Sequence, residues 1–474
     1  MHNSTATING ATITNGSVAG EDKQHIVTEL RCADNTLFTQ SPILQHLAAW
    51  ADARGSSRIA VLAQVLMRTA LAIPPSVVIP ARLGGDHAGL SLLLALVGES
   101  SGGKGRAEAV GRDAIALRSF GQLRRVEPLS PSTGEGLVSI FADSRRDGGR
   151  VTTVVHTPAA LLSYKDIESF EALVNRSGAT LATTLLSLYM GDTLGFVTRE
   201  AARRVVLPAH TVVGGLSAGM QPGKGRVLLS EEMRASGMPQ RFLWTPVRAG
   251  RRVTRGTPPP PLTVDLPDFG ISAASPYDIV SEFAPGEGVD TGSLVELGVT
   301  EQVAAEVLAA DVEKDLDVFG AVPAGEDQLA GHLNLTRLKV AAALAALHGG
   351  VNITTTWWEL AGIVMDVSLA TQSAVQYATF TAQVQDEGRK GELLGHRQAA
   401  AETTRDSETL NDVVSKLYAK VGRDWGTVNS KAFLTPRKQQ FVEAAWDRLI
   451  SEGKVEERPH PAKRLNTVQY RRIT

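Results

Sequence analysis

The sequence predicts an α/β protein whose sheet-containing core follows a helical brace and precedes a helical region. From about Ser76 to Arg248, short apolar runs alternate with amphipathic helical patterns, which is typical of α/β sheets. One run, Leu90–Val97, leads directly into a Gly/Ser-rich turn and then a helical pattern. Four consecutive prolines at 258–261 close this region, because proline lacks the N–H that a helix or central strand needs. The predicted strands are SVVIP, LSLLLALV, VTTVVHT, AALLSY, RRVVLPAHTVVGGLSAG and RFLWTPV.

The 474 residues are too many for one compact core, so two or three domains are expected. Before the sheet, Ser41 and Pro42 form a good helix start, and Pro74 and Pro75 end a second helical pattern. The C-terminal stretch combines three helical patterns with a two-stranded ribbon and a basic turn, which is typical of a winged helix. The predicted segments are a disordered leader (1–22), an N-terminal helical brace (23–75), the α/β core (76–250), a Pro-rich linker (251–275), a helical domain (276–400) and a winged helix (405–474).

Composition excludes several classes of protein. The hydrophobic fraction of 43% and the charged fraction of 21% are ordinary for globular proteins. The formal net charge is -2, so any nucleic-acid-binding surface must be local. Cys32 is the only cysteine, which excludes a cysteine-rich zinc site and agrees with a reducing cytoplasm. Neither a signal-peptide pattern nor an apolar stretch of about 20 residues occurs, so a cytoplasmic protein without a membrane partner is expected.

The turn after Leu90–Val97 has the pattern of a phosphate-binding loop. GESSGGK, residues 98–104, matches G-x-x-x-x-G-K between an apolar strand and a helix, which is the context that the motif requires. Its backbone N–H groups and Lys104 would bind the phosphates of ATP, with Mg²⁺ as the second cofactor. Gly105 departs from the usual Ser or Thr, so another oxygen must hold magnesium. The predicted nucleotide-binding residues are Gly98, Glu99, Ser100, Ser101, Gly102, Gly103, Lys104, Gly105 and Arg106.

An acidic residue at the end of a second core strand is expected to complete this site. The run AALLSY ends at Tyr164, and Asp166 follows as the predicted metal ligand and catalytic carboxylate, with Glu168 as the second choice. Lys165 stands where an acid is usual. Both acids also suit a helix N-terminus, where the helix dipole favours negative charge. Glu135, in STGEGLV, is a further acid that either faces the nucleotide or starts a helix.

The predicted winged helix carries a group of basic residues. These could neutralise several DNA phosphates, giving a salt-sensitive affinity, while Gln439 and Gln440 could reach base edges. Many winged helices instead pack against protein, and Glu452, Glu456 and Glu457 dilute the positive charge. The predicted DNA-binding residues are Lys431, Arg437, Lys438, Lys463 and Arg464, with Arg471 and Arg472 in or beside the wing.

Several stretches of the chain are informative together: PILQHL, VLAQVLMRTALAIPPSVVIP, LLLALVGESSGGKG, STGEGLV, NRSGATLATTLLSLYMGDTLGF, GLSAGMQP and SGMPQRFLW. Together they resemble a family of P-loop ATPases of poorly defined function that phages, plasmids and other mobile elements encode. The resemblance covers about residues 35 to 375. It implies a RecA/AAA-like ATPase core and a helicase-like role in replication, often beside primase-polymerase domains. A glycine after the loop lysine is tolerated in that family, whereas its strand-end site usually has two adjacent acids and this chain has Lys165-Asp166.

The resemblance also implies catalytic roles for other residues. Gln221, in AGMQP, would be a polar sensor that orients the attacking water, although a simple turn before Pro222 explains it equally well. Arg241, in GMPQRFLW, would stabilise transition-state charge in a neighbouring subunit, with an ordinary salt bridge as the alternative. Arg176 and Lys339 are candidates for DNA contact or phosphate sensing.

Together these patterns lead us to expect a DNA-dependent ATPase, an oligomeric replicative helicase or unwinding initiator of a phage or mobile element. Its expected partners are single-stranded DNA, duplex DNA through the winged helix, further copies of itself in a ring such as a hexamer, and a separate primase or polymerase. The alternative is a nucleotide-regulated DNA-binding protein, an origin or repressor protein, with weak or no ATP hydrolysis. A small-molecule kinase also suits the GGKG loop, but has no use for the helical region and winged helix.

Overall fold

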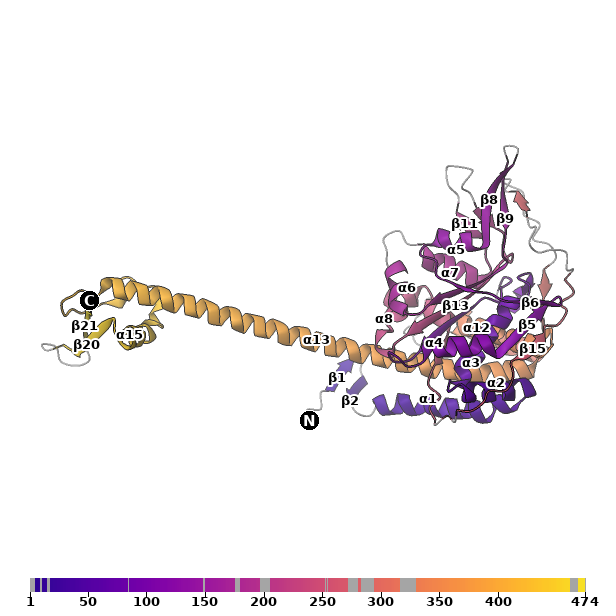
Figure 1. Cartoon of the computed structure of the whole chain (residues 1–474), viewed down its shortest axis with the longest axis horizontal. Coiled ribbons are helices and arrows are strands. Elements are labelled where there is room, and N and C mark those ends of the chain that lie inside the picture. The colour runs from indigo at the N-terminus through magenta and orange to yellow at the C-terminus, as the bar shows by residue number, and fades with distance from the viewer. Residues whose placement is uncertain are drawn as a thin grey trace. The chain divides into compact units, whose positions relative to one another are not determined.

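The computed structural model describes residues 5–8, 11–14, 18–83, 85–147, 150–174, 180–196, 205–251, 253, 255–271, 280–282, 294–315, 330–460 and 468–473 (Figure 1). The chain is mixed α/β, as the sequence predicts, and forms two compact units, Met1–Ala382 and Gln383–Thr474. None of the described helices combines the length and apolar character needed to cross a membrane.

A five-stranded parallel sheet is the centre of the first unit. Its order is β14-β4-β13-β10-β7, so β13 lies between β4 and β10. Every residue of β4, β13 and β14 is buried, as expected for parallel strands that are covered on both faces. The strands are β4 (Leu92–Val97), β7 (Pro128–Leu129), β10 (Ala159–Tyr164), β13 (Val213–Met220) and β14 (Phe242–Pro246).

The remaining strands form small separate sheets. The predicted strands SVVIP and VTTVVHT are present as β3 and β9, but they pair with β17 and with β8 and β16, outside the central sheet. β15 falls within the predicted Pro-rich linker and pairs with β5, because half-buried Leu262 and Val264 alternate with exposed Thr263 and Asp265. These strands are β3 (Val77–Val78), β5 (Ile115–Ser119), β6 (Gln122–Arg124), β8 (Ala142–Asp147), β9 (Arg150–Val155), β11 (Leu194–Phe196), β12 (Val205–Leu207), β15 (Leu262–Asp265), β16 (Val280–Glu282), β17 (Val295–Glu296), β18 (Gly298–Val299) and β19 (Asn352–Ile353).

The helices before the sheet begin where the sequence places them. Ser41 caps α2 (Pro42–Ala53) by accepting a hydrogen bond from the Leu44 N–H at 3.1 Å. In α3 (Arg58–Ala72), every residue except Arg58 and Arg68 is buried, so this helix is part of the core rather than a peripheral brace. The predicted leader differs from the structure: β1 (Thr5–Ile8) pairs with β2 (Ala11–Thr14), and α1 (Val18–Asn35) begins at Val18.

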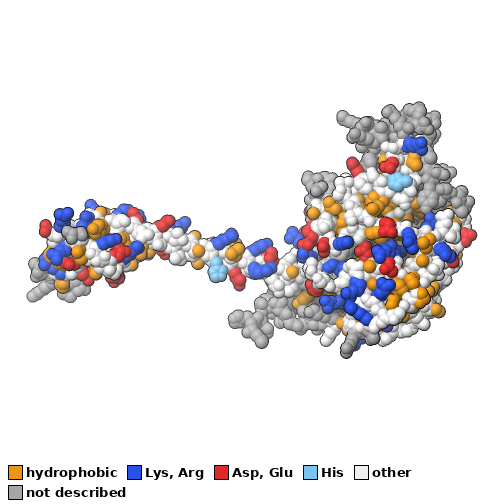
Figure 2. Space-filling view, in the orientation of Figure 1, with side chains coloured by type: hydrophobic (Ala, Val, Ile, Leu, Met, Phe, Trp, Pro, Cys, Tyr) orange, Lys and Arg blue, Asp and Glu red, His pale blue; other side chains and the backbone are white. Residues whose placement is uncertain are grey.

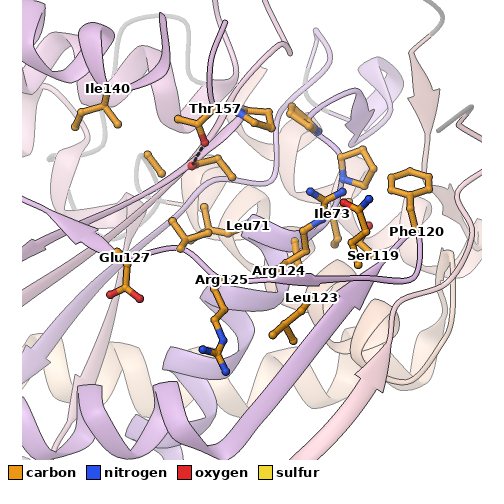
Figure 3. Close-up of a pocket in the computed structure, with 18 of the residues that line it drawn as sticks. Leu71, Ile73, Ser119, Phe120, Leu123, Arg124, Arg125, Glu127, Ile140 and Thr157 are labelled. Atoms are coloured by element: carbon orange, nitrogen blue, oxygen red, sulfur yellow. Dashed lines mark hydrogen bonds between the residues drawn. The ribbon is translucent and has the colours of Figure 1, made fainter. Parts of the chain in front are cut away.

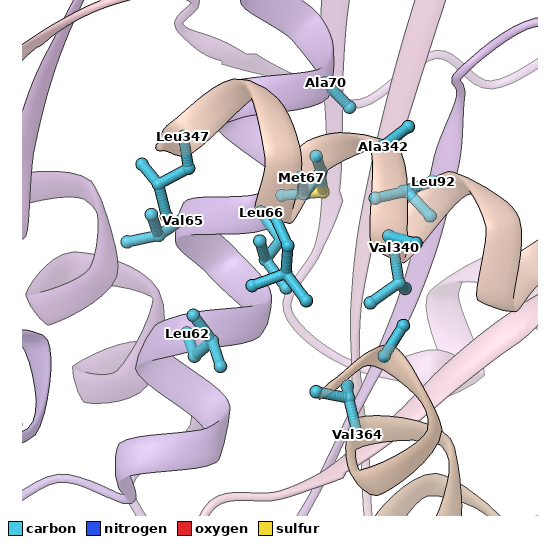
Figure 4. Packing of buried hydrophobic residues seen from close by; sticks show 14 of the residues in the cluster. Leu62, Val65, Leu66, Met67, Ala70, Leu92, Val340, Ala342, Leu347 and Val364 are labelled. Atoms are coloured by element: carbon cyan, nitrogen blue, oxygen red, sulfur yellow. The ribbon is translucent and has the colours of Figure 1, made fainter. Parts of the chain in front are cut away.

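The largest hydrophobic cluster joins α3 to the sheet and to helices from much later in the chain. Leu66 and Met67 of α3 lie with Leu92 of β4, Val340 of α12 and Val364 of α13 (Figure 4). The predicted brace, core and the first part of the predicted helical domain therefore share one core. The later helices are α11 (Glu301–Asp315), α12 (Ala330–Leu347) and α13 (Thr355–Lys420).

A second cluster contains the aromatic side chains of Phe141, Phe170, Tyr189 and Trp244. It joins the sheet to the shorter helices that connect its strands. These are α5 (Gly134–Phe141), α6 (Ile167–Val174), α7 (Leu181–Met190), α8 (Arg226–Leu229), α9 (Glu231–Ala235) and α10 (Met238–Arg241).

The second unit contains the end of α13, two helices and a two-stranded antiparallel ribbon, in the order that the sequence predicts. Its core includes Trp446, whose ring stacks on that of Tyr470 with centroids 3.8 Å apart. The helical pattern beginning at Pro436 is divided into α14 (Pro436–Gln439) and α15 (Val442–Ser451). The ribbon strands are β20 (Val455–Pro459) and β21 (Val468–Arg472).

Two glycines in α4 (Lys104–Ala114) give a matched test of how this helix packs on α3. A Cβ on Gly111 would lie 2.4 Å from the Gln64 Cβ, whereas a Cβ on Gly105 meets nothing within 4 Å. We expect Gly111→Ala to lower the free energy of unfolding by about 1 to 3 kcal/mol, because the two backbones must separate. Gly105→Ala should raise it by about 0.5 to 1 kcal/mol through helix propensity. Urea unfolding measures both, and equal stabilisation by the two variants would contradict the close α3–α4 contact.

Candidate functional site

The predicted phosphate loop connects the carboxyl end of β4 to the start of α4. The Gly98 N–H donates to the Met220 carbonyl at 2.9 Å, which ties the loop to the end of the neighbouring strand β13. Gly103 has a φ of 101°, and a Cβ on Gly102 would lie 2.7 Å from the Glu99 carbonyl oxygen. Both positions therefore favour glycine for local steric reasons. A helix N-terminus at the carboxyl edge of a parallel sheet is a common place for phosphate binding.

A cavity of about 380 Å³ lies over this loop. Six of the predicted nucleotide-binding residues line it, Ser101 to Arg106, whereas Gly98, Glu99 and Ser100 do not. The Lys104 ammonium donates to the carbonyl oxygens of Gly98 at 2.9 Å and Glu99 at 3.2 Å. The lysine therefore lies folded against its own loop, beside the cavity.

The opposite wall of the cavity comes from β10 and β13, through Tyr164, Lys165, Ser217 and Gly219. A Cβ on Gly219 would lie 2.1 Å from the Lys165 carbonyl oxygen, so only glycine allows the end of β10 to approach β13 this closely. Burial raises the pKa of the Tyr164 phenol to about 12, and its hydroxyl donates to the Pro131 carbonyl. Tyr164 is therefore a neutral hydrogen-bond donor at physiological pH.

The carboxylate that lines the cavity is Glu108, which the sequence analysis did not identify. It lies on α4 one turn after Lys104 and accepts a hydrogen bond from the Ser163 hydroxyl of β10 at 2.9 Å. Asp166 is exposed and does not line the cavity, although it follows closely after β10. Glu168 forms an ion pair with Lys224 at 2.7 Å. The spacing of four residues from Lys104 was the available signal for Glu108, since residues i and i+4 share a helix face.

The other predicted catalytic residues lie outside the cavity lining. Gln221 is half-buried between β13 and the short helix Pro222–Lys224. Arg241 is only 8% exposed, donates to the Ser236 carbonyl at 3.0 Å and lies over the Tyr189 ring. This burial places its guanidinium inside its own subunit, where a neighbouring subunit has no access to it. Glu135 is exposed in the first turn of α5.

Lys339 is fully buried, in contrast to the DNA-contacting or phosphate-sensing role suggested by the sequence. Its ammonium donates to the carbonyl oxygens of Ser91 at 3.3 Å and of Tyr189, and it lies 3.3 Å from the centre of the Tyr189 ring. Burial, and secondarily the nearby Arg241 guanidinium, hold the pKa of Lys339 well below its usual range. Arg176 lies outside the described residues.

The lowered pKa of Lys339 predicts a pH-dependent stability. Between the folded pKa and the higher unfolded one, the unfolded chain binds more protons, so the free energy of unfolding rises with pH. We expect Lys339→Met to remove this rise, measured by urea unfolding between about pH 7 and 9.5. Lys416→Met, at an exposed lysine of α13, is the control and should keep it. An unchanged slope in Lys339→Met would contradict the assignment.

Several predicted DNA-binding residues already have partners within the second unit. Lys438 pairs with Asp412 at 2.8 Å, Arg471 pairs with Glu456 at 2.7 Å, and Arg472 donates to the Tyr418 carbonyl. Lys431 and Arg437 are exposed and form no ion pair or hydrogen bond with other described side chains. Lys463 and Arg464 lie outside the described residues.

No protein-family profile matches the chain, and no curated protein sequence matches it.

Proposed function

We propose that the protein is a DNA-dependent ATPase that works as an oligomeric helicase or unwinding initiator of a mobile element. The observation that carries this proposal is the phosphate loop, which lies at the carboxyl edge of a parallel sheet with Lys104 beside a cavity of about 380 Å³. That volume falls in the range of ordinary small-ligand sites. The residues present therefore fit a nucleotide phosphate chain.

The loop and helix supply the groups that bind phosphate. The N-terminus of α4 carries the positive end of the helix dipole, and Lys104 provides a mobile positive charge once it leaves the loop carbonyls. ATP, when bound, supplies the phosphoanhydride bond to be hydrolysed, and magnesium neutralises part of its charge. Tyr164 and Lys165 close the opposite side of the cavity.

We assign Glu108 to the magnesium side of the site, in place of the hydroxyl that Gly105 lacks. Glu108 lines the cavity and is oriented by the Ser163 hydroxyl, whereas Lys165 stands where the strand would usually supply an acid. Asp166 remains our candidate for the general base, since it follows Lys165 directly. The carboxylates of Glu108 and Asp166 would thus divide the roles that two adjacent acids have in the family the sequence resembles.

This division of roles predicts different defects for two conservative variants. We expect Glu108→Gln to raise the magnesium concentration for half-maximal turnover by about 10- to 100-fold, with turnover partly restored at high magnesium. Asp166→Asn should lower turnover at every magnesium concentration. Glu232→Gln, at an exposed acid of α9, is the control. A wild-type magnesium dependence in Glu108→Gln would exclude this carboxylate from the metal site.

The DNA and assembly parts of the proposal have separate support. The resemblance of residues 35 to 375 to helicase-like ATPases suggests a ring of identical subunits and a separate primase or polymerase. Exposed Lys431 and Arg437 favour contact between a winged helix and DNA phosphates. Arg241 is given no role between subunits, because it is buried.

ATP turnover by the purified full chain, with and without single-stranded DNA, tests the proposal. Turnover that DNA stimulates supports a motor. ATP binding with negligible turnover would instead favour the alternative, a nucleotide-regulated DNA-binding protein. The specific observation in favour of this alternative is Lys165, which places a positive charge where an acid is usual.

A further inference from the structure

A second concave region lies at the opposite edge of the central sheet from the phosphate loop. Its cavity of about 500 Å³ is lined by Ala159 and Ala160, the first residues of β10, whereas the nucleotide cavity is lined by the last residue of this strand, Tyr164 (Figure 3). A neighbouring cavity of about 430 Å³ shares Leu123, Arg125 and other residues with it. The two cavities share Leu71, Ala72 and residues 123–127 as a wall, and we call these adjoining cavities beside the β5–β6 hairpin the groove.

The tip of this hairpin has an unfavourable backbone conformation. Phe120 has a φ of 52° and Gly121 a φ of 72°, as in a two-residue turn of the type that normally favours Asn-Gly. A bulky residue in this region is strained, and such strain often accompanies function. The Phe120 side chain is nevertheless 38% exposed, so its ring does not compensate by complete burial in the core. Leu123 and Leu129, 45% and 47% exposed, line the same groove.

Arginine side chains accompany these apolar groups. Residues 114–126 include three arginines, Arg118, Arg124 and Arg125, and no acidic residue. Arg125 is exposed and, among the described residues, forms no hydrogen bond or ion pair; Figure 3 shows its side chain directed away from the hairpin. Asp265 of β15 lies opposite Arg118 of β5, but the two side chains do not form an ion pair.

The neighbouring cavity of about 430 Å³ is also lined by Arg68 and Arg112. Arg112 pairs with Asp113 at 2.8 Å. Arg68 is half-buried, has no carboxylate partner within ion-pair distance in the described part of the chain, and its Nε is buried without a hydrogen-bond partner. Glu127 is the other acid of the groove, so arginines outnumber acids there. Figure 2 also shows Lys and Arg side chains gathered over α4, which runs toward this groove.

We propose that the groove binds single-stranded nucleic acid, with a base stacked on Phe120 and phosphates held by Arg125, Arg68 and Arg112. An exposed aromatic ring beside a positively charged groove is the combination that sequence-independent single-strand binding uses. The excess of arginines favours a polyanion over an apolar protein partner. The inference rests on the proposed DNA-dependent ATPase and names a strand-binding surface for it in the same unit as the phosphate loop.

Helix α4 gives this groove a direct connection to the nucleotide site. It begins at Lys104, carries Arg112 in its last turn, and passes without a loop into β5 at Ile115. Eleven helical residues span about 16 Å. A nucleic-acid strand that pulls on the hairpin would therefore act on the same helix whose first turn would bind phosphate. This connection would explain stimulation of ATP turnover by DNA.

Fluorescence anisotropy of labelled oligothymidylate and oligouridylate with the full chain tests the proposal, with nucleotide absent. We expect Phe120→Asn, which suits the left-handed backbone but lacks the ring, to weaken binding by roughly 5- to 100-fold, and Phe120→Tyr to restore it. Arg125→Ala should reduce the slope of log affinity against log salt by about 0.7. Arg405→Ala, at an exposed arginine of α13 to which no DNA contact is assigned, is the matched control and should keep both the affinity and the slope. ATP turnover without DNA should be the same in the Phe120 and Arg125 variants as in the wild type.

The outcomes separate this inference from the proposed function. If the wild type binds the oligonucleotides and both Phe120→Asn and Arg125→Ala bind equally well, the groove is not the strand site, although DNA-stimulated turnover can still stand. If these variants lose binding but the wild type never hydrolyses ATP, the groove stands and the ATPase proposal fails. Variants that alter sedimentation but not affinity would make the groove an interface between copies and overturn the inference. A wild type that binds neither oligonucleotide overturns both the DNA part of the function and the groove.

Discussion

Replacement of Lys104 by alanine is expected to lower ATP turnover by about 100- to 1,000-fold, the usual effect of removing one group that stabilises transition-state charge. Lys104 is half-buried beside the cavity and supplies its positive charge at the start of α4. Nucleotide affinity should fall as well, because the same ammonium would bind the phosphates of the ground state. Steady-state turnover and equilibrium binding of a fluorescent ATP analogue measure the two effects.

Lys390→Ala is the matched control for this variant. Lys390 is an exposed lysine of α13 whose described partner is Asp386, so its loss should leave turnover unchanged. Thermal unfolding should give similar midpoints for both variants, since the Lys104 ammonium bonds only to two carbonyls of its own loop. Turnover by Lys104→Ala at the wild-type rate would place ATP hydrolysis elsewhere or in a contaminating enzyme.

The largest stability effect is expected at Trp358, and its neighbour Trp357 supplies the comparison. Trp358 is 2% exposed, donates to the Glu306 carboxylate of α11 at 2.6 Å and packs against the Arg337 guanidinium of α12 at 3.8 Å. Trp358→Ala should lower the free energy of unfolding by about 3 to 5 kcal/mol, because it leaves a cavity and removes the packing on the Arg337 guanidinium.

Trp357 is half-buried and stacks on His348 with ring centroids 4.5 Å apart. Trp357→Ala should cost only about 1 kcal/mol, since the ring loses one aromatic contact and little burial. Urea unfolding of the full chain, followed by circular dichroism, compares the two. Similar losses for both variants would mean that α13 does not bury Trp358 against α11 and α12.

Local signals in the sequence predicted the elements better than their pairing. Ser41 and Pro42 start α2 as expected, and the apolar run at Leu92–Val97 is the buried strand β4. β3 and β9 are also strands as predicted, but periodicity does not indicate which strand pairs with which, so their place outside the central sheet was not foreseen. The burial of α3 depends on helices that follow it by more than 250 residues, and no local pattern reports such contacts.

At the candidate site too, local features were visible in the sequence and contacts between distant segments were not. The loop from Ser101 to Arg106 was predicted because the motif is continuous in sequence and its chemistry is local. Glu108 was missed because its importance depends on a bond to Ser163, which lies on another strand. Arg241 and Lys339 were expected to act on ligands because of the family resemblance, and only the tertiary structure shows their burial.

The burial of α3 has a consequence for biosynthesis. This helix is almost entirely buried, yet its partner α12 begins at Ala330, 258 residues after α3 ends at Ala72. A ribosome that adds about 5 to 20 residues per second leaves α3 without that partner for roughly 10 to 50 seconds. During this interval Leu62, Leu66 and Met67 lack their contacts with α12, so we expect the yield of intact protein to rise with chaperones that bind apolar segments.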